Sequence, residues 1–367
     1  MSAASTARSA LTGSAARDLG RSLIAVAVAI LLSGVLIQAS GYSATDAFQV
    51  MWDGAFGGRA AVAETLRITT TLLFTSLGFT IAFRVGVFNL GGQGQFAVGS
   101  FAGAWIGFTL TDLPGWAIIA LAFAAGMLVG ALTALGPALL LARYGVNEVI
   151  STLMLSFIVL RGLDYLVQYP FRATAGETTA TKPVAGSAEL TRLLPPSSLS
   201  WALILGLVLV VAYACFLRFT ALGYEMEMVG TNRRFAEYGG LSVTKVVIIA
   251  MVVSGAIAGL GGVQEVLGVQ HRYMSRLAYD AAFAGIAASF LARNRPLGLI
   301  PACLFLGALQ NGALQLQLFS EVPRSIAEIL TGLVVLLAVA TTWPWRGWLR
   351  RVALVVRRAP VAAEGAR

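Results

Sequence analysis

Long apolar stretches recur along the whole chain, and they constrain its fold more than any other feature. A helix needs about 20 predominantly apolar residues to cross the hydrocarbon core of a bilayer. Ten stretches reach or approach this length: Leu23–Ile37, Leu66–Phe83, Phe96–Leu110, Trp116–Leu141, Val149–Val167, Trp201–Leu217, Val246–Val269, Ala278–Leu291, Leu297–Leu309 and Ile326–Trp343. Backbone polar groups in lipid must be hydrogen-bonded within the protein, which favours helices. The sequence therefore predicts an all-α, polytopic membrane protein with about ten transmembrane helices.

The composition supports this fold class. Of the 367 residues, 57% are hydrophobic and only 12% are charged, whereas a soluble domain carries roughly 25% charged residues. The 40 glycines suit helices that pack closely in lipid. The net charge of +9 is read as Lys and Arg retained on the cytoplasmic side, and not as a nucleic-acid surface.

The positions of the basic residues predict the orientation. With a cytoplasmic N-terminus and ten alternating spans, 17 of the 26 Lys and Arg fall in cytoplasmic segments, as the positive-inside rule requires. Both termini are expected inside. The predicted organisation is a cytoplasmic tail 1–20, a transmembrane domain 21–345 and a basic cytoplasmic tail 346–367. Within the domain, 169–200 forms an external loop and 220–245 a cytoplasmic segment with a short surface helix.

A glycine- and amide-rich stretch, Gly86–Phe96, interrupts the apolar pattern between the second and third predicted spans. Non-helical backbone at membrane depth is tolerated where it lines a cavity or packs in protein, and in transporters such breaks lie beside the path. Asn89, Gln93 and Gln95 would be costly beside lipid, which favours a path over the alternative of an ordinary glycine-rich surface turn.

A related stretch, Gly259–Gly268, closes the seventh predicted span. Its Leu-Gly-Gly step followed by Gln264 and Glu265 resembles Asn89–Gln95, which indicates a possible internal inverted repeat. We expect breaks at Gly91–Gly94 and Gly259–Gly262, with the path running beside them. An ionisable residue within a span usually faces a cavity or a partner. Glu265 is expected either to do so or to sit at the outer interface in water.

Other polar residues have simpler interpretations. Arg161 and Asp164, at i and i+3, predict a structural ion pair on one helix face. Asn147 predicts a helix N-cap. The end of the ninth span and the following loop are rich in amides, which line an outward-facing vestibule or merely face water: Gln310, Asn311, Gln315 and Gln317.

Several chemistries find little support. Cys215 and Cys303 lie in apolar runs and read as small buried residues, not as a disulfide or metal site. His271 is the only histidine, so no catalytic residues and no metal ligands are predicted. A phosphate-binding P-loop needs Gly-x-x-x-x-Gly-Lys-Ser/Thr, and neither Lys182 nor Lys245 fits it. Any ATP must be hydrolysed by another subunit.

Three segments carry a resemblance to a known family. They are Phe88–Gln95, Val146–Leu155 and the run from Leu222–Glu225 through Gly230–Gly240 to Ser254–Gly262. The chain resembles the permease subunits of bacterial ABC importers in the ribose and branched-chain amino acid permease superfamily, in the branch for nucleoside and simple-sugar uptake. Gln93 departs from the usual Glu, Arg233 from Pro and Phe235 from Ala.

The resemblance implies a multi-pass permease of the bacterial inner (plasma) membrane that works with separate ATPase subunits and an extracytoplasmic substrate-binding protein. A second permease, the same chain or a sister chain, would form the translocation path together with this one. The chain binds no cofactor itself, and the partner ATPase uses ATP. Residues expected on the translocation path are Phe88, Asn89, Gln93, Gln95, Gln264 and Glu265. Residues expected to couple to the ATPase are Glu227, Gly230, Arg233, Arg234, Glu237 and Gly240.

Nucleosides are the expected substrate, with simple sugars of the ribose or galactose type as the alternative. An ion-coupled secondary transporter would need a buried carboxylate relay, for which Glu265 and Asp280 offer little. A membrane enzyme is disfavoured by the single His271.

Overall fold

The computed structural model describes residues 28, 31–173, 179–275, 279–320 and 322–340. The chain forms two compact units, one of residues 46–322 and one of the flanking residues up to 45 and from 323 onward. The flanking unit contains helical residues 31–39 and α13 (Arg324–Ala340). The predicted tails 1–20 and 346–367 lie outside the described residues.

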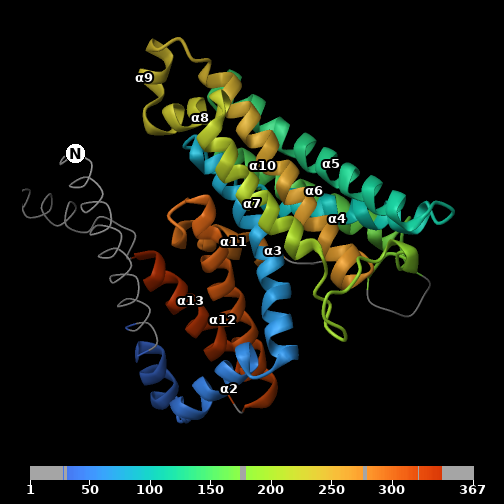
Figure 1. Cartoon of the computed structure of the whole chain (residues 1–367), viewed down its shortest axis with the longest axis vertical. Helices are drawn as coiled ribbons and strands as arrows, with labels where there is room; N and C mark the ends of the chain where they lie inside the picture. Colours follow the sequence, from blue (N-terminus) through green and yellow to red (C-terminus); the bar gives the residue numbers. More distant parts are fainter. Residues whose placement is uncertain (1–27, 29–30, 174–178, 276–278, 321, 341–367) are drawn as a thin grey trace, which may run out of the picture. The chain divides into compact units, whose positions relative to one another are not determined.

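The larger unit is helical throughout its main elements (Figure 1). They are α2 (Ala44–Phe56), whose first two residues belong to the flanking unit, α3 (Arg59–Arg84), α4 (Gly92–Thr109), α5 (Gly115–Tyr144), α6 (Glu148–Gln168), α7 (Ala202–Phe219), α8 (Ala221–Thr231), α9 (Arg233–Tyr238), α10 (Val243–Glu265), α11 (Tyr279–Leu291) and α12 (Leu299–Phe319). Each apolar stretch predicted between Leu66 and Leu309 coincides with a helix. Helix α2 was not among the predicted spans. Helix α12 extends to Phe319, so its amides lie on a helix and not in a loop.

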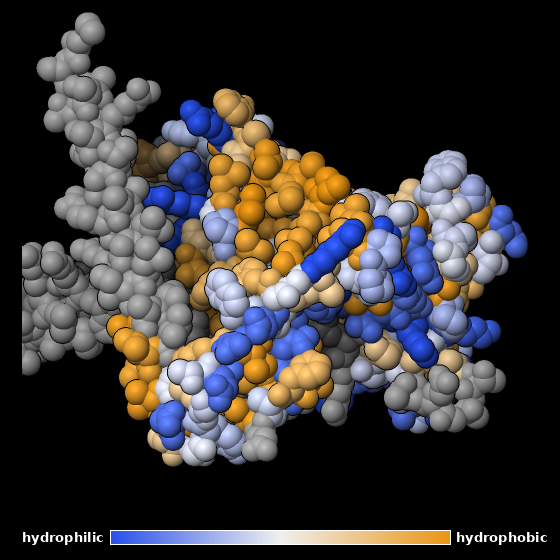
Figure 2. Space-filling model, turned by 60° about the horizontal axis from the view of Figure 1, so that its bottom comes forward, coloured by the Kyte–Doolittle hydropathy of each residue, from blue (hydrophilic) through white to orange (hydrophobic). Residues whose placement is uncertain are grey.

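Six helices in the described part of the chain are long and apolar enough to cross a membrane: α3, α5, α6, α7, α10 with its continuation to Gln270, and Pro296–Phe319 containing α12. The protein is therefore a multi-pass membrane protein. Figure 2 shows apolar side chains gathered over a broad patch of one face. Most residues of α5, α6 and α7 are not buried inside the protein, and their exposed side chains are largely apolar, as a lipid-facing surface requires.

The centre of the unit is formed by α3 and α10. Helix α10 packs against α3, α4 and α5, while α3 also contacts α11 and α12 (Figure 1). Helix α3 buries many hydroxyls, and some of them bond to carbonyl oxygens one turn earlier: Thr69 Oγ1 to Thr65 O at 2.7 Å and Thr70 Oγ1 to Leu66 O at 2.8 Å. Such back-bonding satisfies a hydroxyl where no water is present.

Glycines bring α10 into backbone contact with its neighbours. A Cβ atom at Gly259 would overlap the carbonyl oxygen of Gly126 on α5, and one at Gly99 on α4 would overlap that of Gly259. The predicted break at Gly259–Gly262 is wrong, because these residues continue α10 without interruption. Their glycines serve close helix packing, and the irregular backbone comes later, in the π-helical segment Val266–Gln270 (η2). Of the predicted break Gly91–Gly94, only Gly91 lies outside a helix, because α4 begins at Gly92.

Two connecting segments lie at opposite ends of α10. Residues 179–200, within the predicted external loop 169–200, fold over the C-terminal end of α10. There Leu190 N donates to Leu267 O at 3.0 Å and Val184 N to His271 O at 2.8 Å. The predicted surface helix within 220–245 consists of two helices, α8 and α9, which contact α10 as it begins.

Side-chain contacts and burial test the predicted cap at Asn147, the predicted pair Arg161–Asp164 and the predicted burial of the two cysteines. Asn147 caps α6, because its side chain accepts from Val149 N at 2.9 Å, and Arg161 pairs with Asp164 at 3.5 Å. Both predictions are confirmed. Cys303 is buried as expected, but Cys215 is exposed. The prediction for Cys215 is wrong because an apolar run in a membrane helix has an outward face as well as a buried one.

Candidate functional site

The connection between α3 and α4, residues 85–91, is held by two buried amides. Asn89 Nδ2 donates to Gln95 Oε1 at 2.9 Å, and Gln95 Nε2 donates back to Asn89 Oδ1 at 3.1 Å. Asn89 also donates to Ser254 Oγ of α10 at 2.8 Å and accepts from Gly91 N at 3.1 Å. Gly86 has a φ of 73°, which favours glycine. The amides therefore fix this non-helical connection against α10.

A small cavity, here the inner cavity, adjoins this connection. It is lined from α3, the 85–91 connection, α4, α10 and α11, including Thr75, Phe79, Asn89, Gln93, Ser254 and Phe283. Its volume is about 10 Å³, about the least that can hold one water molecule. The cavity carries amides, hydroxyls and aromatic rings and is constricted in this conformation.

The four predicted path residues of this stretch have different surroundings in the structure. Asn89 and Gln93 line the inner cavity. Gln95 is 1% exposed and serves as the partner of Asn89. Phe88 packs edge-on against Phe83 with ring centroids 4.8 Å apart, in an aromatic cluster that also includes Phe79 and Phe290.

Gln264 and Glu265 belong to a second polar cluster, away from the inner cavity. Thr71 Oγ1 of α3 donates to Glu265 Oε2 at 2.7 Å and accepts from Gln264 Nε2 at 2.9 Å. Gln264 also donates to Glu265 Oε2 at 3.4 Å. Glu265 is only 5% exposed, so the alternative that it faces water at the interface is wrong. It faces a partner inside the protein.

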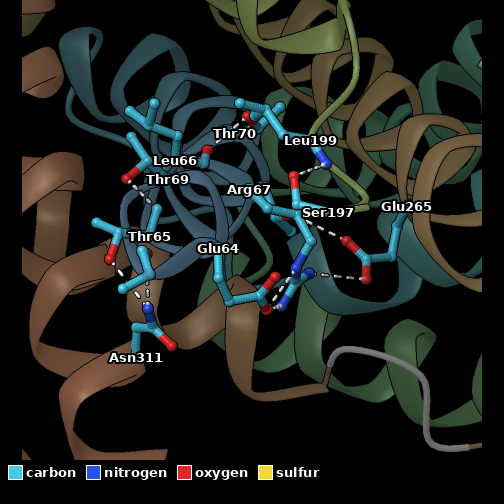
Figure 3. A network of polar contacts seen from close by, with 12 residues as sticks. Glu64, Thr65, Leu66, Arg67, Thr69, Thr70, Ser197, Leu199, Glu265 and Asn311 are labelled. Atoms are coloured by element: carbon cyan, nitrogen blue, oxygen red, sulfur yellow. Dashed lines mark hydrogen bonds and ion pairs between the residues drawn. The ribbon is translucent and has the colours of Figure 1, made fainter. Parts of the chain in front are cut away.

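The cation of this cluster is Arg67 on α3, which the sequence analysis did not identify. Its Nη2 lies 2.6 Å from Glu64 Oε1, and its Nη1 lies 3.8 Å from Glu265 Oε1. Figure 3 shows the guanidinium between the two carboxylates. The i, i+3 spacing of Glu64 and Arg67 indicated that the two could pair. Such a charged pair is also common where a span begins in water, so it did not point to a buried cluster.

A larger cavity, here called the outer cavity, borders this cluster at Glu64. It has a volume of about 550 Å³ and is lined by residues that include Asp53, Glu64, Ser197 and Gln315. Its wall is tied together by Asn311 Nδ2, which donates to Gly54 O at 2.8 Å. In the described residues, no three His, Cys, Asp or Glu side chains lie close enough together to hold a metal ion.

Three of the predicted coupling residues, on α8 and α9, contact the C-terminal end of α3 or the connection that follows it. Glu227 pairs with Arg84 at 2.9 Å, and Arg233 donates to the carbonyl oxygen of Gly86 at 3.3 Å. A Cβ atom at Gly230 would overlap the Arg84 carbonyl oxygen. These contacts join the two helices to the connection that carries Asn89.

Most of α9 faces outward. Every residue of Arg233–Tyr238 except Ala236 is exposed, and the exposed fractions of Phe235 and Tyr238 reach 61% and 90%. Arg234 and Glu237 add charges of opposite sign. Aromatic residues and arginine are enriched at protein interfaces, and this exposed surface carries both. Gly240 follows it with a φ of 81°.

Comparison with known proteins gives a consistent result. Residues 61–339 match the family described as the branched-chain amino acid transport system permease component. The chain is 32% identical to the nucleoside ABC transporter permease protein of Lactococcus lactis subsp. cremoris, over 85% of this chain and 88% of that protein. It is 32% identical to the guanosine ABC transporter permease protein of Bacillus subtilis, over 86% and 91%. It is 29% identical to the glucose ABC transporter permease protein of Haloferax volcanii, over 88% and 87%.

Proposed function

The chain belongs to the family of branched-chain amino acid transport system permease components, and we propose that it is a permease subunit of an ATP-driven importer for nucleosides. The observation that carries this proposal is the 32% identity, over most of the chain, to permeases for nucleosides and for guanosine. Such a permease moves a solute and is not an enzyme.

The lining of the inner cavity matches a neutral, polar and partly aromatic solute, which would enter when the constricted cavity widens. None of its lining residues is charged. The rings of Phe79 and Phe283 offer apolar faces for a base, and Asn89, Gln93 and Thr75 offer hydrogen-bonding groups for its edge or for ribose hydroxyls. Simple sugars of the ribose or galactose type are the second candidate, supported by the identity to a glucose permease.

We infer that the chain crosses the bacterial inner membrane ten times with both termini in the cytoplasm. The six long helices would be joined by α4, α11, α13 and the helix that includes residues 31–39. The positions of 179–200 and of α8–α9 at opposite ends of α10 support alternating sides. A possible inverted repeat accords with the related stretches around Asn89 and Gln264.

The proposed complex contains two ATPase subunits, a second permease of the same or a sister sequence, and an extracytoplasmic substrate-binding protein. The ATPases supply the nucleotide chemistry and dock on α8 and α9. The contacts of Glu227, Gly230 and Arg233 with residues 84–86 give docking a direct route to the connection that carries Asn89 and borders the inner cavity.

Uptake of radiolabelled guanosine, adenosine and ribose by cells with and without this gene tests the substrate. We expect nucleoside uptake to fall by about tenfold or more on deletion, with ribose uptake unchanged, and to return on complementation. Ribose-only loss would establish the sugar alternative. Unchanged uptake of every nucleoside would contradict the proposed substrate.

A further inference from the structure

Helices α7 and α10 border a groove, here called the α7–α10 groove. Both helices pack against α3 and against α8, but within the described residues they are not close neighbours of each other. The space between them has a volume of about 290 Å³, and its buried floor includes Leu77 and Ile81 of α3 and Met226 of α8. Its rim includes Val253 of α10, which is 40% exposed. The groove is therefore open to the surroundings of the membrane-spanning helices.

The lining of the α7–α10 groove is apolar at every residue except Tyr213. Water finds no polar partners in such a space, and an empty groove forfeits dispersion contacts. The lining residues of α10 extend from Ile249 to Ile257, which is about 12 Å along the helix. A long and narrow hydrocarbon chain matches this shape and this chemistry.

Tyr213 adds a polar group to this apolar lining. Its side chain is 8% exposed, and its hydroxyl makes no hydrogen bond within the described structure. Arg84 lies within electrostatic range of Tyr213, and its Nε also lacks a hydrogen-bond partner there. Buried polar groups without partners cost free energy. Both groups are donors, so an occupant that carries acceptor oxygens beside its hydrocarbon chain would be favoured over hydrocarbon alone.

A lysine lies beyond one end of the α7–α10 groove. Ile249, Val253 and Ile257 line the groove on α10, and Lys245 precedes Ile249 by the same spacing of four residues, which places it on the same helix face. Lys245 is exposed, near the start of α10, where α8 and α9 contact that helix. A lysine at the end of a span extends its amine to the level of the lipid headgroups, where it attracts anionic lipid.

We propose that the α7–α10 groove binds one anionic phospholipid of the cytoplasmic leaflet. An acyl chain lies between α7 and α10, an ester or phosphate oxygen accepts a hydrogen bond from Tyr213, and the headgroup lies at Lys245. The lipid then also contacts α8, because Leu222 and Met226 line the groove. The proposal rests on the proposed function only for the side of the membrane on which α8 and α9 lie.

Photochemical labelling in bilayers tests the site. The full importer is reconstituted in phosphatidylcholine with a small fraction of phosphatidylglycerol that carries a diazirine on its acyl chain. Mass spectrometry then locates the label, which is expected on residues 209–216 of α7 and 249–257 of α10.

Two matched variants separate a specific site from general lipid contact. Val253→Trp fills the α7–α10 groove, whereas Val208→Trp makes the same change at an exposed position of α7 outside it. In each variant the label is counted on the helix that does not carry the substitution. Val253→Trp should reduce the label by about fivefold or more, and Val208→Trp should leave it unchanged. Equal labelling in the two variants would overturn the site.

The headgroup is tested in the parent protein, without any change to the groove. Diazirine-labelled phosphatidylglycerol should label the groove about fivefold more than the matching phosphatidylcholine, which is the factor that one lysine near an anionic lipid contributes. Lys245→Gln should abolish this preference, and Lys182→Gln, which removes the only other lysine of the chain, should leave it unchanged. Equal labelling by the two lipids in the parent protein, or no label on either helix, would overturn the proposal. Because labelling needs neither solute nor ATP, absence of nucleoside uptake would refute the substrate and leave this result standing.

Discussion

Replacing Gly259 with leucine is expected to remove most of the folded protein from the membrane. Gly259 lies where α10 crosses α4 and α5, and the atoms that a side chain would meet belong to backbone: the carbonyl oxygen of Gly126 and the Cα of Gly130. A flexible neighbour can rotate away from an added methyl group, but a helix backbone moves only as a whole. Helices α4, α5 and α10 would have to separate.

The expected cost lies at or above the upper end of ordinary overpacking, about 3 kcal/mol, which should lower the midpoint of thermal unfolding in detergent by about 5 °C or more. Fluorescence-detected size-exclusion chromatography of a tagged chain measures both the amount and the midpoint. Gly162→Leu is the matched control, because a Cβ atom there meets nothing within 4 Å in the described structure. If both variants behave alike, the glycine contacts of α10 do not determine stability.

The sequence predicted those parts of the fold that depend on local pattern. Apolar stretches between Leu66 and Leu309 became helices because hydrocarbon leaves the backbone few alternatives. The cap at Asn147 and the pair Arg161–Asp164 depend only on neighbours along the chain. Helix α2 escaped prediction because it is short and carries Asp46 and Asp53, so its pattern differs from that of a span.

Features that depend on tertiary partners were harder to predict. Amides in an apolar region marked Asn89 and Gln93, and the inner cavity indeed borders both. Glu265 was recognised, but Arg67 was not, because only the packing of α3 on α10 brings these distant residues together. The same cause explains the error at Gly259–Gly262. Glycines that break a helix and glycines that let two helices touch have the same sequence pattern.

Removing the charges of Arg233 and Glu237 should release the ATPase subunits from this chain without affecting its fold. Both side chains are exposed on α9, where substitutions usually change stability by less than about 0.5 kcal/mol. The hydrogen bond that is lost with Arg233, to Gly86 O at 3.3 Å, is itself exposed. Interface residues of this kind often contribute more than 1 kcal/mol each to binding, so Arg233→Ala/Glu237→Ala should weaken docking by about tenfold or more. Co-purification of the ATPases with a tagged permease measures this loss.

The control pair is Arg192→Ala/Glu189→Ala, in the segment at the opposite end of α10, where charge is removed equally but no ATPase is expected to dock. Both double variants should give the same size-exclusion profile as the parent chain. Normal ATPase recovery together with normal transport in Arg233→Ala/Glu237→Ala would contradict the assignment of α9 as the docking surface.

Gly230→Leu distinguishes docking from transmission. Gly230 lies against the carbonyl oxygen of Arg84, so an added side chain must push α8 away from the end of α3 while α9 keeps its exposed surface. The ATPases should then remain bound and hydrolyse ATP, but uptake should fall by about tenfold, because α8 no longer moves residues 85–91 and Asn89 with it. Loss of ATPase binding in this variant would mean that docking and transmission use the same contacts, and unchanged uptake would mean that the motion reaches the inner cavity by another route.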